Sequence, residues 1–315
     1  MSAATAPARL RSPAVSALLA CALVLAAAGC RERAPAGAAS DPVQAVAVLN
    51  GHLRDNDLEG FARDAVPPSL RPALAEAWRA GRTRWPLEEL PFDHRIPGML
   101  GALAADGAED RLRRGYDRQF ANAHGEIRAA AEALGLFGVK YLESDASLSP
   151  EERRHYVQLV EALGEWGGRA KLGDPRQARN AISALADAAR RTGLKEEADF
   201  RRYGMDESLH RLGPMMAALK QSLRAYDLDL DQSLDRMALT LESRDGDRAR
   251  VRMRYPLAGR TIDTVVAVEQ VDGHWYLSDF LRHARAAADA PAPAAAPPAP
   301  AESPDRATTT KATSS

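Results

Sequence analysis

The spacing of apolar residues changes once along this chain, and this change constrains the fold more than any other feature. Up to about Tyr226, apolar residues recur every three or four positions, which is the period of an amphipathic helix. From Met237 to Phe280 they alternate with polar residues, which is the period of a strand with one buried face. Because helices come first and strands follow, we expect an α+β, predominantly helical fold.

Capping residues and prolines place the helices. Asp41-Pro42 offers an N-cap followed by proline in the first turn, and Ser149-Pro150-Glu151-Glu152 has the pattern of a capping box. The segment from Gly81 to Gly98 contains three prolines and is predicted to be an irregular loop. The predicted helices cover residues 41–56, a short segment from 57 to the prolines at 67 and 68, residues around 70–78, then 99–105, 109–121, 126–141, a helix starting at 149, and finally 174–193 and 206–226.

Three turns divide the second part of the chain into four predicted strands. The turns are Asp245-Gly246, Ala258-Gly259 and Asp272-Gly273, and the last is typical of a tight hairpin. We therefore expect a helical region over residues 41–204, followed over residues 205–283 by a helix and a four-strand antiparallel meander with one face on the core. Residues 284–315 are rich in Ala, Pro, Ser and Thr without periodicity, and we expect them to be disordered.

The first 29 residues have the composition of an export signal. Arg9 and Arg11 precede an apolar run from Ala14 to Ala28, which is followed by Gly29 and Cys30. The run is 15 residues long, whereas a helix needs roughly 20 apolar residues to cross a bilayer. We therefore expect a segment that is removed, not a permanent transmembrane helix.

Leu25-Ala26-Ala27-Ala28-Gly29-Cys30 resembles the lipobox of bacterial lipoproteins. The resemblance covers only this segment, and Ala27 stands where that family usually has leucine. It implies cleavage after Gly29 and attachment of fatty acyl chains such as palmitate to Cys30. Arg31 stands where lipoproteins retained in the inner membrane carry aspartate, so the resemblance implies the periplasmic face of the outer membrane of a Gram-negative bacterium. The alternative is an ordinary cleavable signal peptide with a chance cysteine.

Composition limits the partners and the chemistry of the mature chain. Removing the signal takes away two arginines and no acid, which leaves 40 basic and 43 acidic side chains. This balance gives no reason to expect nucleic acid as a partner. Cys21 leaves with the signal and Cys30 is used by lipid, so no disulfide is expected. Residues 30–40 form a polar tether of at most ~35 Å.

The segment from Asp206 to His283 resembles the closing half of the cone-shaped fold shared by SnoaL-like proteins and nuclear transport factor two. The resemblance rests on a helix leading into a meander that ends Val271-Asp272-Gly273-His274-Trp275-Tyr276-Leu277. It implies that residues 41–61 form the first helix of the cone. It also implies a pocket lined by Tyr255, Trp275 and Asp279, in which the carboxylate takes a substrate proton. The alternative is that Tyr255 and Trp275 are ordinary core residues.

A ladder of four arginines, Arg248, Arg250, Arg252 and Arg254, lies on one face of a predicted strand. Such a face can bind an anion such as a phosphate or a glycan carboxylate. The turns, however, place Glu242 opposite Arg250, Asp263 opposite Arg254 and Glu269 opposite Arg248. Opposed charges of this kind are common on a solvated sheet face, and we favour that interpretation.

Two further clusters invite a chemical role. Asp227, Asp229, Asp231 and Asp235 suggest calcium, but the glycine and the glutamate that an EF-hand requires are replaced by Gln232 and Ala238. Asp93-His94 is a carboxylate next to an imidazole, yet adjacent residues usually point apart. No metal site or cofactor is predicted.

We therefore expect a membrane-anchored periplasmic lipoprotein that binds an envelope protein or glycan, or acts as a scaffold, rather than an enzyme. The alternative is a small-molecule-binding, hydrolase-type or isomerase-type pocket in a cone-shaped α+β domain. An unpaired carboxylate or histidine in a closed cavity would favour the alternative.

Overall fold

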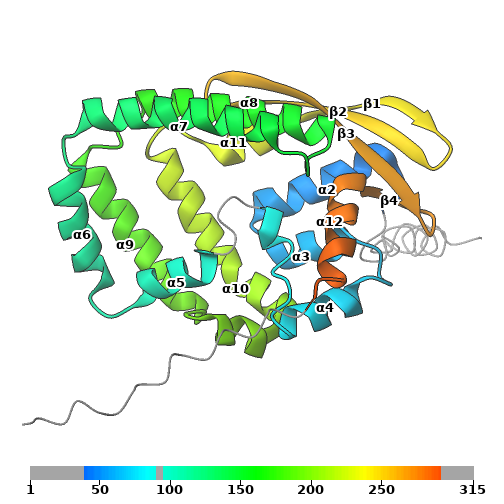
Figure 1. The fold of residues 1–315 in the computed structure, drawn as a ribbon, viewed down its shortest axis with the longest axis horizontal. Helices are drawn as coiled ribbons and strands as arrows, with labels where there is room; N and C mark the ends of the chain where they lie inside the picture. The colour runs from blue at the N-terminus through cyan, green and yellow to red at the C-terminus, as the bar shows by residue number, and fades with distance from the viewer. Residues whose placement is uncertain (1–38, 90–94, 292–315) are drawn as a thin grey trace, which may run out of the picture.

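The structure, a computed structural model, describes residues 39–89 and 95–291. Its sheet is a four-stranded antiparallel meander in the order β1-β2-β3-β4, as predicted (Figure 1). Both central residues of the β2–β3 and β3–β4 turns have positive φ, which matches the right-handed twist of the flanking strands. The strands are β1 (Ala238–Asp245), β2 (Arg248–Leu257), β3 (Arg260–Val271) and β4 (His274–Leu277).

The register of the sheet agrees with the predicted charge pairs except at one position. Arg254 lies opposite Asp263 and Arg248 lies opposite Glu269. Arg250, however, pairs with Ser243 and not with Glu242, because the β1–β2 ladder shifts between Leu241 and Ser243. Since a bulge adds one unpaired residue to a strand, the prediction for Glu242 was wrong by one position.

Helices make up most of the described residues, which confirms the α+β, predominantly helical fold class. Their bounds are α2 (Pro42–Asp55), α3 (Leu58–Asp64), α4 (Arg71–Arg79), α5 (Ile96–Ala104), α6 (Ala108–Gln119), α7 (His124–Ser144), α8 (Pro150–Arg169), α9 (Pro175–Thr192), α10 (Glu197–Arg224), α11 (Leu230–Asp235) and α12 (Ser278–Ala288), with a 3₁₀ turn η1 (Leu87–Glu89).

Local capping explains where several of these helices begin. Ser149 accepts a hydrogen bond from the backbone N–H of Glu152, whose carboxylate accepts one from the backbone N–H of Ser149. Both bonds satisfy backbone groups that lack a partner at the start of a helix. Asp41 and Asp174 cap α2 and α9 with their carboxylates alone, which accept hydrogen bonds from backbone N–H groups of the first turn, and Gly193 ends α9 in the left-handed conformation.

Helices also occupy three segments where the sequence predicted other structure. The predicted loop from Gly81 to Gly98 contains η1 and the start of α5. The helix predicted from Asp206 begins at Glu197, and Gly204 interrupts its dihedral angles, so the predicted boundary at 204 and 205 falls on a kink within α10. Residues 230–235 form α11, which was not predicted.

The C-terminal boundary was also wrong. Phe280, which we assigned to the last strand, lies in α12, and that helix continues through Ala284 to Ala288. Ala284 is fully buried, because its small side chain allows α12 to pack closely against α4. The predicted disorder is therefore contradicted for residues 284–288, and residues 292–315 lie outside the described chain.

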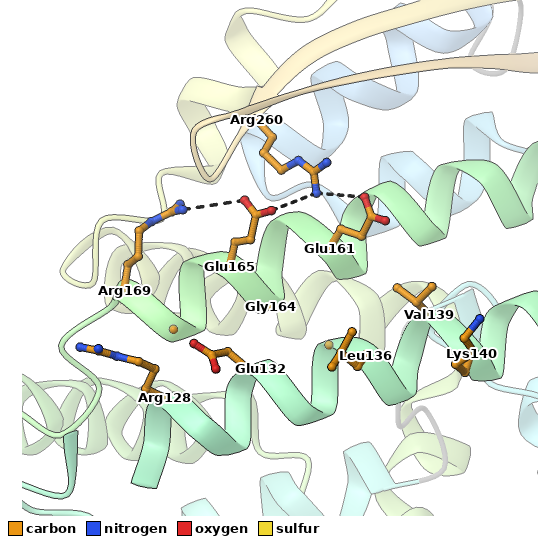
Figure 2. Close-up of a pocket in the computed structure, with 12 residues that line it drawn as sticks. Arg128, Glu132, Leu136, Val139, Lys140, Glu161, Gly164, Glu165, Arg169 and Arg260 are labelled. Carbon is orange, nitrogen blue, oxygen red and sulfur yellow. Dashed lines mark hydrogen bonds and ion pairs between the residues drawn. The ribbon is translucent and has the colours of Figure 1, made fainter. Parts of the chain in front are cut away.

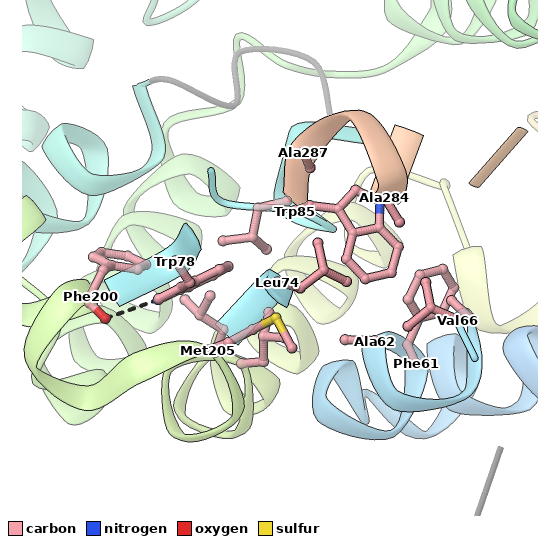
Figure 3. Packing of buried hydrophobic residues seen from close by; sticks show 14 of the residues in the cluster. Phe61, Ala62, Val66, Leu74, Trp78, Trp85, Phe200, Met205, Ala284 and Ala287 are labelled. Atoms are coloured by element: carbon pink, nitrogen blue, oxygen red, sulfur yellow. Dashed lines mark hydrogen bonds between the residues drawn. The ribbon is translucent and has the colours of Figure 1, made fainter. Parts of the chain in front are cut away.

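The largest core joins both parts of the chain (Figure 3). Trp78 of α4 is fully buried and donates a hydrogen bond from Nε1 to the carbonyl oxygen of Phe200, at 2.9 Å. Trp85, from the predicted loop, packs into the same cluster as Ala284 and Ala287 of α12. The helical region and the sheet region therefore share one core.

A second core joins α2 to the sheet. Ala45 and Val46 pack against Val251, Val268 and Trp275. The cone resemblance implies one first helix over residues 41–61, but this segment forms α2 and α3, separated by the left-handed turn at Asn56. The resemblance itself stays a prediction.

A buried lysine connects α2 to α10 and α11. Lys220 of α10 is 3% exposed, and its Nζ donates to the carbonyl oxygens of Leu53 and Arg54 at 2.6 and 3.0 Å. The same ammonium group lies 2.7 Å from a carboxylate oxygen of Asp231 in α11. Lys220 thus donates to carbonyl groups in the last turn of α2, and the Leu53 carbonyl also accepts a hydrogen bond from the backbone N–H of Asn56.

Candidate functional site

Three of the four arginines of the ladder pair with carboxylates from three elements. Arg252 lies 3.0 Å from Glu242 and 3.2 Å from Asp263, and Arg254 lies 2.8 Å from Asp263. Arg250 contacts Glu242 on β1 and also Glu151 at the start of α8, at 3.2 Å. Of the three expected charge pairs, Arg250–Glu242 and Arg254–Asp263 form ion pairs, whereas Glu269 pairs with Arg285 of α12 at 3.2 Å. The pairing of these arginines supports a solvated sheet face rather than an anion site.

The three residues predicted to line a pocket lie in three different environments. Tyr255 belongs to the cluster around Ala162, whereas Trp275 belongs to the α2–sheet core. Asp279 lies in the first turn of α12, where it accepts a hydrogen bond from the Ser149 hydroxyl at 3.1 Å and pairs with Arg282. These residues do not form one site, and the tyrosine and tryptophan are buried as core residues.

The structure instead brings Tyr255 next to a histidine that the sequence analysis did not single out. His155 Nε2 lies 2.6 Å from the Tyr255 hydroxyl oxygen. Burial lowers the pKa of His155 to about 4 and raises the pKa of Tyr255 above its usual range. The pair is therefore neutral at pH 7, and its polar atoms satisfy each other within the core.

A second unpredicted cluster surrounds His283 on α12. Its Nδ1 lies 2.9 Å from Glu89 of η1, and its Nε2 lies 3.5 Å from Glu152 of α8. A hydrogen bond to Glu89 raises the pKa of His283, while burial opposes the shift. Since Nδ1 is hydrogen-bonded to Glu89 and Nε2 lies near Glu152, this imidazole joins three elements of the fold.

A surface groove of about 1030 Å³ runs between α7 and α8 and reaches the β2–β3 turn (Figure 2). Its floor is made by Gly135, Gly164 and Gly168, because two helices that approach through glycines leave a furrow between them. Arg260 pairs across one wall with Glu161 at 2.9 Å and with Glu165 at 3.4 Å. Four cationic and three anionic side chains line the groove, so it favours neither sign of charge.

The most unusual surface is the apolar face of α7. None of its 21 residues is buried, although the helix contacts α8 along its length. Leu134 and Phe137 are each 69% exposed and Tyr141 is 60% exposed. Their spacing of three and four residues puts them on one side of the helix, next to the small residues Ala131 and Gly138 that contact α8. We call Leu134, Phe137 and Tyr141 the apolar stripe of α7.

The aspartates that suggested calcium have structural roles. Asp229 caps α11, and Asp231 pairs with Lys220 and with Arg224. No cluster of metal-ligating side chains occurs within residues 39–89 and 95–291. Cys30, Gly29 and the Asp93-His94 pair lie outside the part of the chain that the structure describes.

Comparisons with known proteins identify no relative. None of the helices described is both long enough and apolar enough to cross a membrane. No protein family, no curated protein and no solved structure matches this chain.

Proposed function

We propose that the chain is a secreted lipoprotein, cleaved after Gly29 and held to the periplasmic face of a membrane by lipid on Cys30. The support is the lipobox pattern, together with the position at which the described fold begins. Ala39 is already buried, and its carbonyl oxygen accepts a hydrogen bond from the backbone N–H of Trp275 at 2.9 Å. Eight residues separate Cys30 from Ala39, and they span at most about 28 Å. The domain therefore stays close to the membrane that anchors it.

Two or three acyl chains on Cys30 make this attachment nearly permanent, since each buried methylene contributes about 0.8 kcal/mol. Arg31 follows the cysteine, and the lipoprotein resemblance then assigns the outer membrane.

The anchored domain acts by binding a partner in the envelope rather than by catalysis. The observation that carries this part of the proposal is the apolar stripe of α7, whose side chains are about two-thirds exposed. A group of neighbouring exposed apolar side chains marks an interaction surface more often than a single one does. An apolar stripe suits a protein partner better than a glycan. Catalysis has weaker support, because Nδ1 of His283 is hydrogen-bonded to Glu89 and the half-buried His155 bonds Tyr255.

Thiol labelling tests whether a partner covers the stripe. In the proposed lipoprotein the mature chain has no free thiol, so Phe137→Cys introduces a single one. It should react with a small maleimide that enters the periplasm, and this reaction should be several-fold slower in intact envelopes than in the purified protein. Leu241→Cys is the matched control, since Leu241 is 47% exposed on β1, outside the stripe. Equal labelling of position 137 in both preparations would contradict the binding proposal while leaving the anchor untouched.

A further inference from the structure

His52 connects α2 to both ends of α3. Its Nδ1 lies 2.9 Å from a carboxylate oxygen of Asp57, the residue that caps α3, and its Nε2 lies 2.8 Å from a carboxylate oxygen of Asp64, the last residue of α3. The imidazole side chain is 17% exposed and the Asp64 side chain 12% exposed. Two short contacts thus join one ring to the two ends of a seven-residue helix.

Only the protonated ring can make both contacts. A neutral imidazole has one N–H group and one lone pair, so it can donate to one carboxylate and not to two. If His52 lost a proton, a lone pair would face an ionised carboxylate oxygen at 2.8 or 2.9 Å. One of the two contacts must then break.

The backbone around the ring leaves little room for another arrangement. A Cβ atom at Gly60 would lie 2.0 Å from the Asp57 carboxylate and 2.5 Å from Cε1 of His52. The ring therefore lies directly against the first turn of α3. Asn56, at the corner between α2 and α3, has a φ of 59°, which asparagine tolerates better than most residues.

The helix that His52 holds also carries part of the core. Phe61 and Ala62 of α3 are buried, and the Phe61 ring packs edge-on against Phe280 of α12, with ring centroids 5.6 Å apart. Opening of α3 would therefore expose apolar surface from the main core.

We propose that His52 is a proton-dependent clamp that holds α3 onto the core, and that α3 opens locally when the ring loses its proton. This inference does not depend on the lipid anchor or on the apolar stripe.

The charges around the clamp fix the direction of its pH dependence. A hydrogen bond to Asp64 raises the pKa of His52 above 6.5, burial opposes the shift, and Asp57 adds to it. Burial alone would raise the pKa of Asp64, but hydrogen bonds from His52 and Arg63 outweigh it and leave that pKa lowered. Lys220 of α10 and Asp55 are further charges near this corner.

When a group has a higher pKa in the closed state than in the open state, it stabilises the closed state. This stabilisation is complete when the pH is below the open-state pKa. The stabilisation is lost as the pH rises through the closed-state value. The clamp is therefore closed in mildly acidic solution and opens on the alkaline side of 6.5. On the opposite side of α3, His210 of α10 lies 3.4 Å from Glu59, but this contact is exposed and offers a control.

Hydrogen exchange and NMR on the chain from residue 31 onward test the clamp. We expect the Cε1 proton of His52 to titrate above pH 6.5. The protection factors of the Phe61 and Ala65 amides, corrected for intrinsic exchange, should fall between about pH 6 and about pH 9, by roughly tenfold for each pKa unit by which the folded value exceeds 6.5. Both amides donate hydrogen bonds at the ends of α3.

Two variants separate the clamp from general loosening of the fold. Asp64→Asn should lower the pKa of His52 and reduce the pH dependence of α3 protection, whereas Glu59→Gln should retain it in full. A His52 titration at or below pH 6.5, or α3 protection that is equal at both pH values in the unmodified chain, would overturn the proposal. That result decides the matter even if Asp64→Asn fails to fold.

Discussion

Replacing Lys220 by methionine should lower the free energy of unfolding by about 3 kcal/mol. Methionine keeps most of the apolar stem and removes the ammonium group. The substitution leaves two carbonyl oxygens at the end of α2, those of Leu53 and Arg54, without the donor that now lies within 3.0 Å. It also removes the 2.7 Å ion pair with Asp231.

The magnitude follows from burial. Removing one partner of a buried ion pair typically costs about 3–5 kcal/mol, and a buried carbonyl left unpaired costs about 1–3 kcal/mol. The Leu53 carbonyl keeps its hydrogen bond from the backbone N–H of Asn56, so this second cost applies to Arg54 alone. Asp231 is 31% exposed and keeps its contact with Arg224 at 2.8 Å, so we expect the lower end of the first range.

Urea denaturation followed by circular dichroism measures this loss. The matched control is Lys140→Met, because Lys140 is 80% exposed and pairs with Glu143 in the same helix. That change should cost less than about 1 kcal/mol. If Lys220→Met cost no more than Lys140→Met, the assigned role of the buried ammonium would be wrong.

Two further predictions concern the core and the α7–α8 contact. The folded state keeps His155 neutral, with a pKa of about 4 against 6.5 in the unfolded chain. The free energy of unfolding should therefore fall by up to about 3 kcal/mol as the pH drops from above 6.5 to about 4. His155→Phe should reduce this loss in unfolding measurements across that pH range, and an unchanged slope of stability against pH would count against the proposed His155–Tyr255 pair. Gly167→Ala should destabilise the fold by about 1–3 kcal/mol, because the new Cβ atom would lie 2.9 Å from that of Ala131. Gly168→Ala should be neutral or stabilising by up to about 1 kcal/mol, because the nearest atom to its new Cβ would be 3.6 Å away. Thermal unfolding of both variants measures the difference, and equal effects would contradict the close contact between α7 and α8.

Features that depend on residues close together in the sequence were predictable. The capping box at Ser149 needs only the residues up to Glu152, and the hairpin turn at Asp272-Gly273 needs only its two positive φ angles. The alternation of apolar and polar residues along β2 likewise predicts which of its side chains are buried. Each of these signals depends on backbone geometry within one turn or one strand.

Features that depend on distant contacts were missed. Residues 284–288 have a composition typical of disorder, and they are helical because α4 and the main core cover them. The apolar stripe of α7 looks like an ordinary buried face in sequence. It is exposed because α7 contacts α8 through its smaller residues instead, a choice that no local pattern reveals.

The histidine contacts illustrate the same limit. His52 and Asp64 are 12 residues apart on two helices, and they meet only because of the left-handed turn at Asn56. His283 and Glu89 are 194 residues apart. A search for metal-ligand or catalytic spacing does not find such pairs, because the fold and not the sequence spacing brings them together.

The most direct test of the proposed lipoprotein is the intact mass of the protein from membrane fractions, compared with that of Cys30→Ser. We predict a chain that lacks residues 1–29 and carries acyl chains, and a variant without that added mass that is no longer retained at the membrane. A mature chain of unmodified mass in the soluble fraction would contradict the lipid anchor.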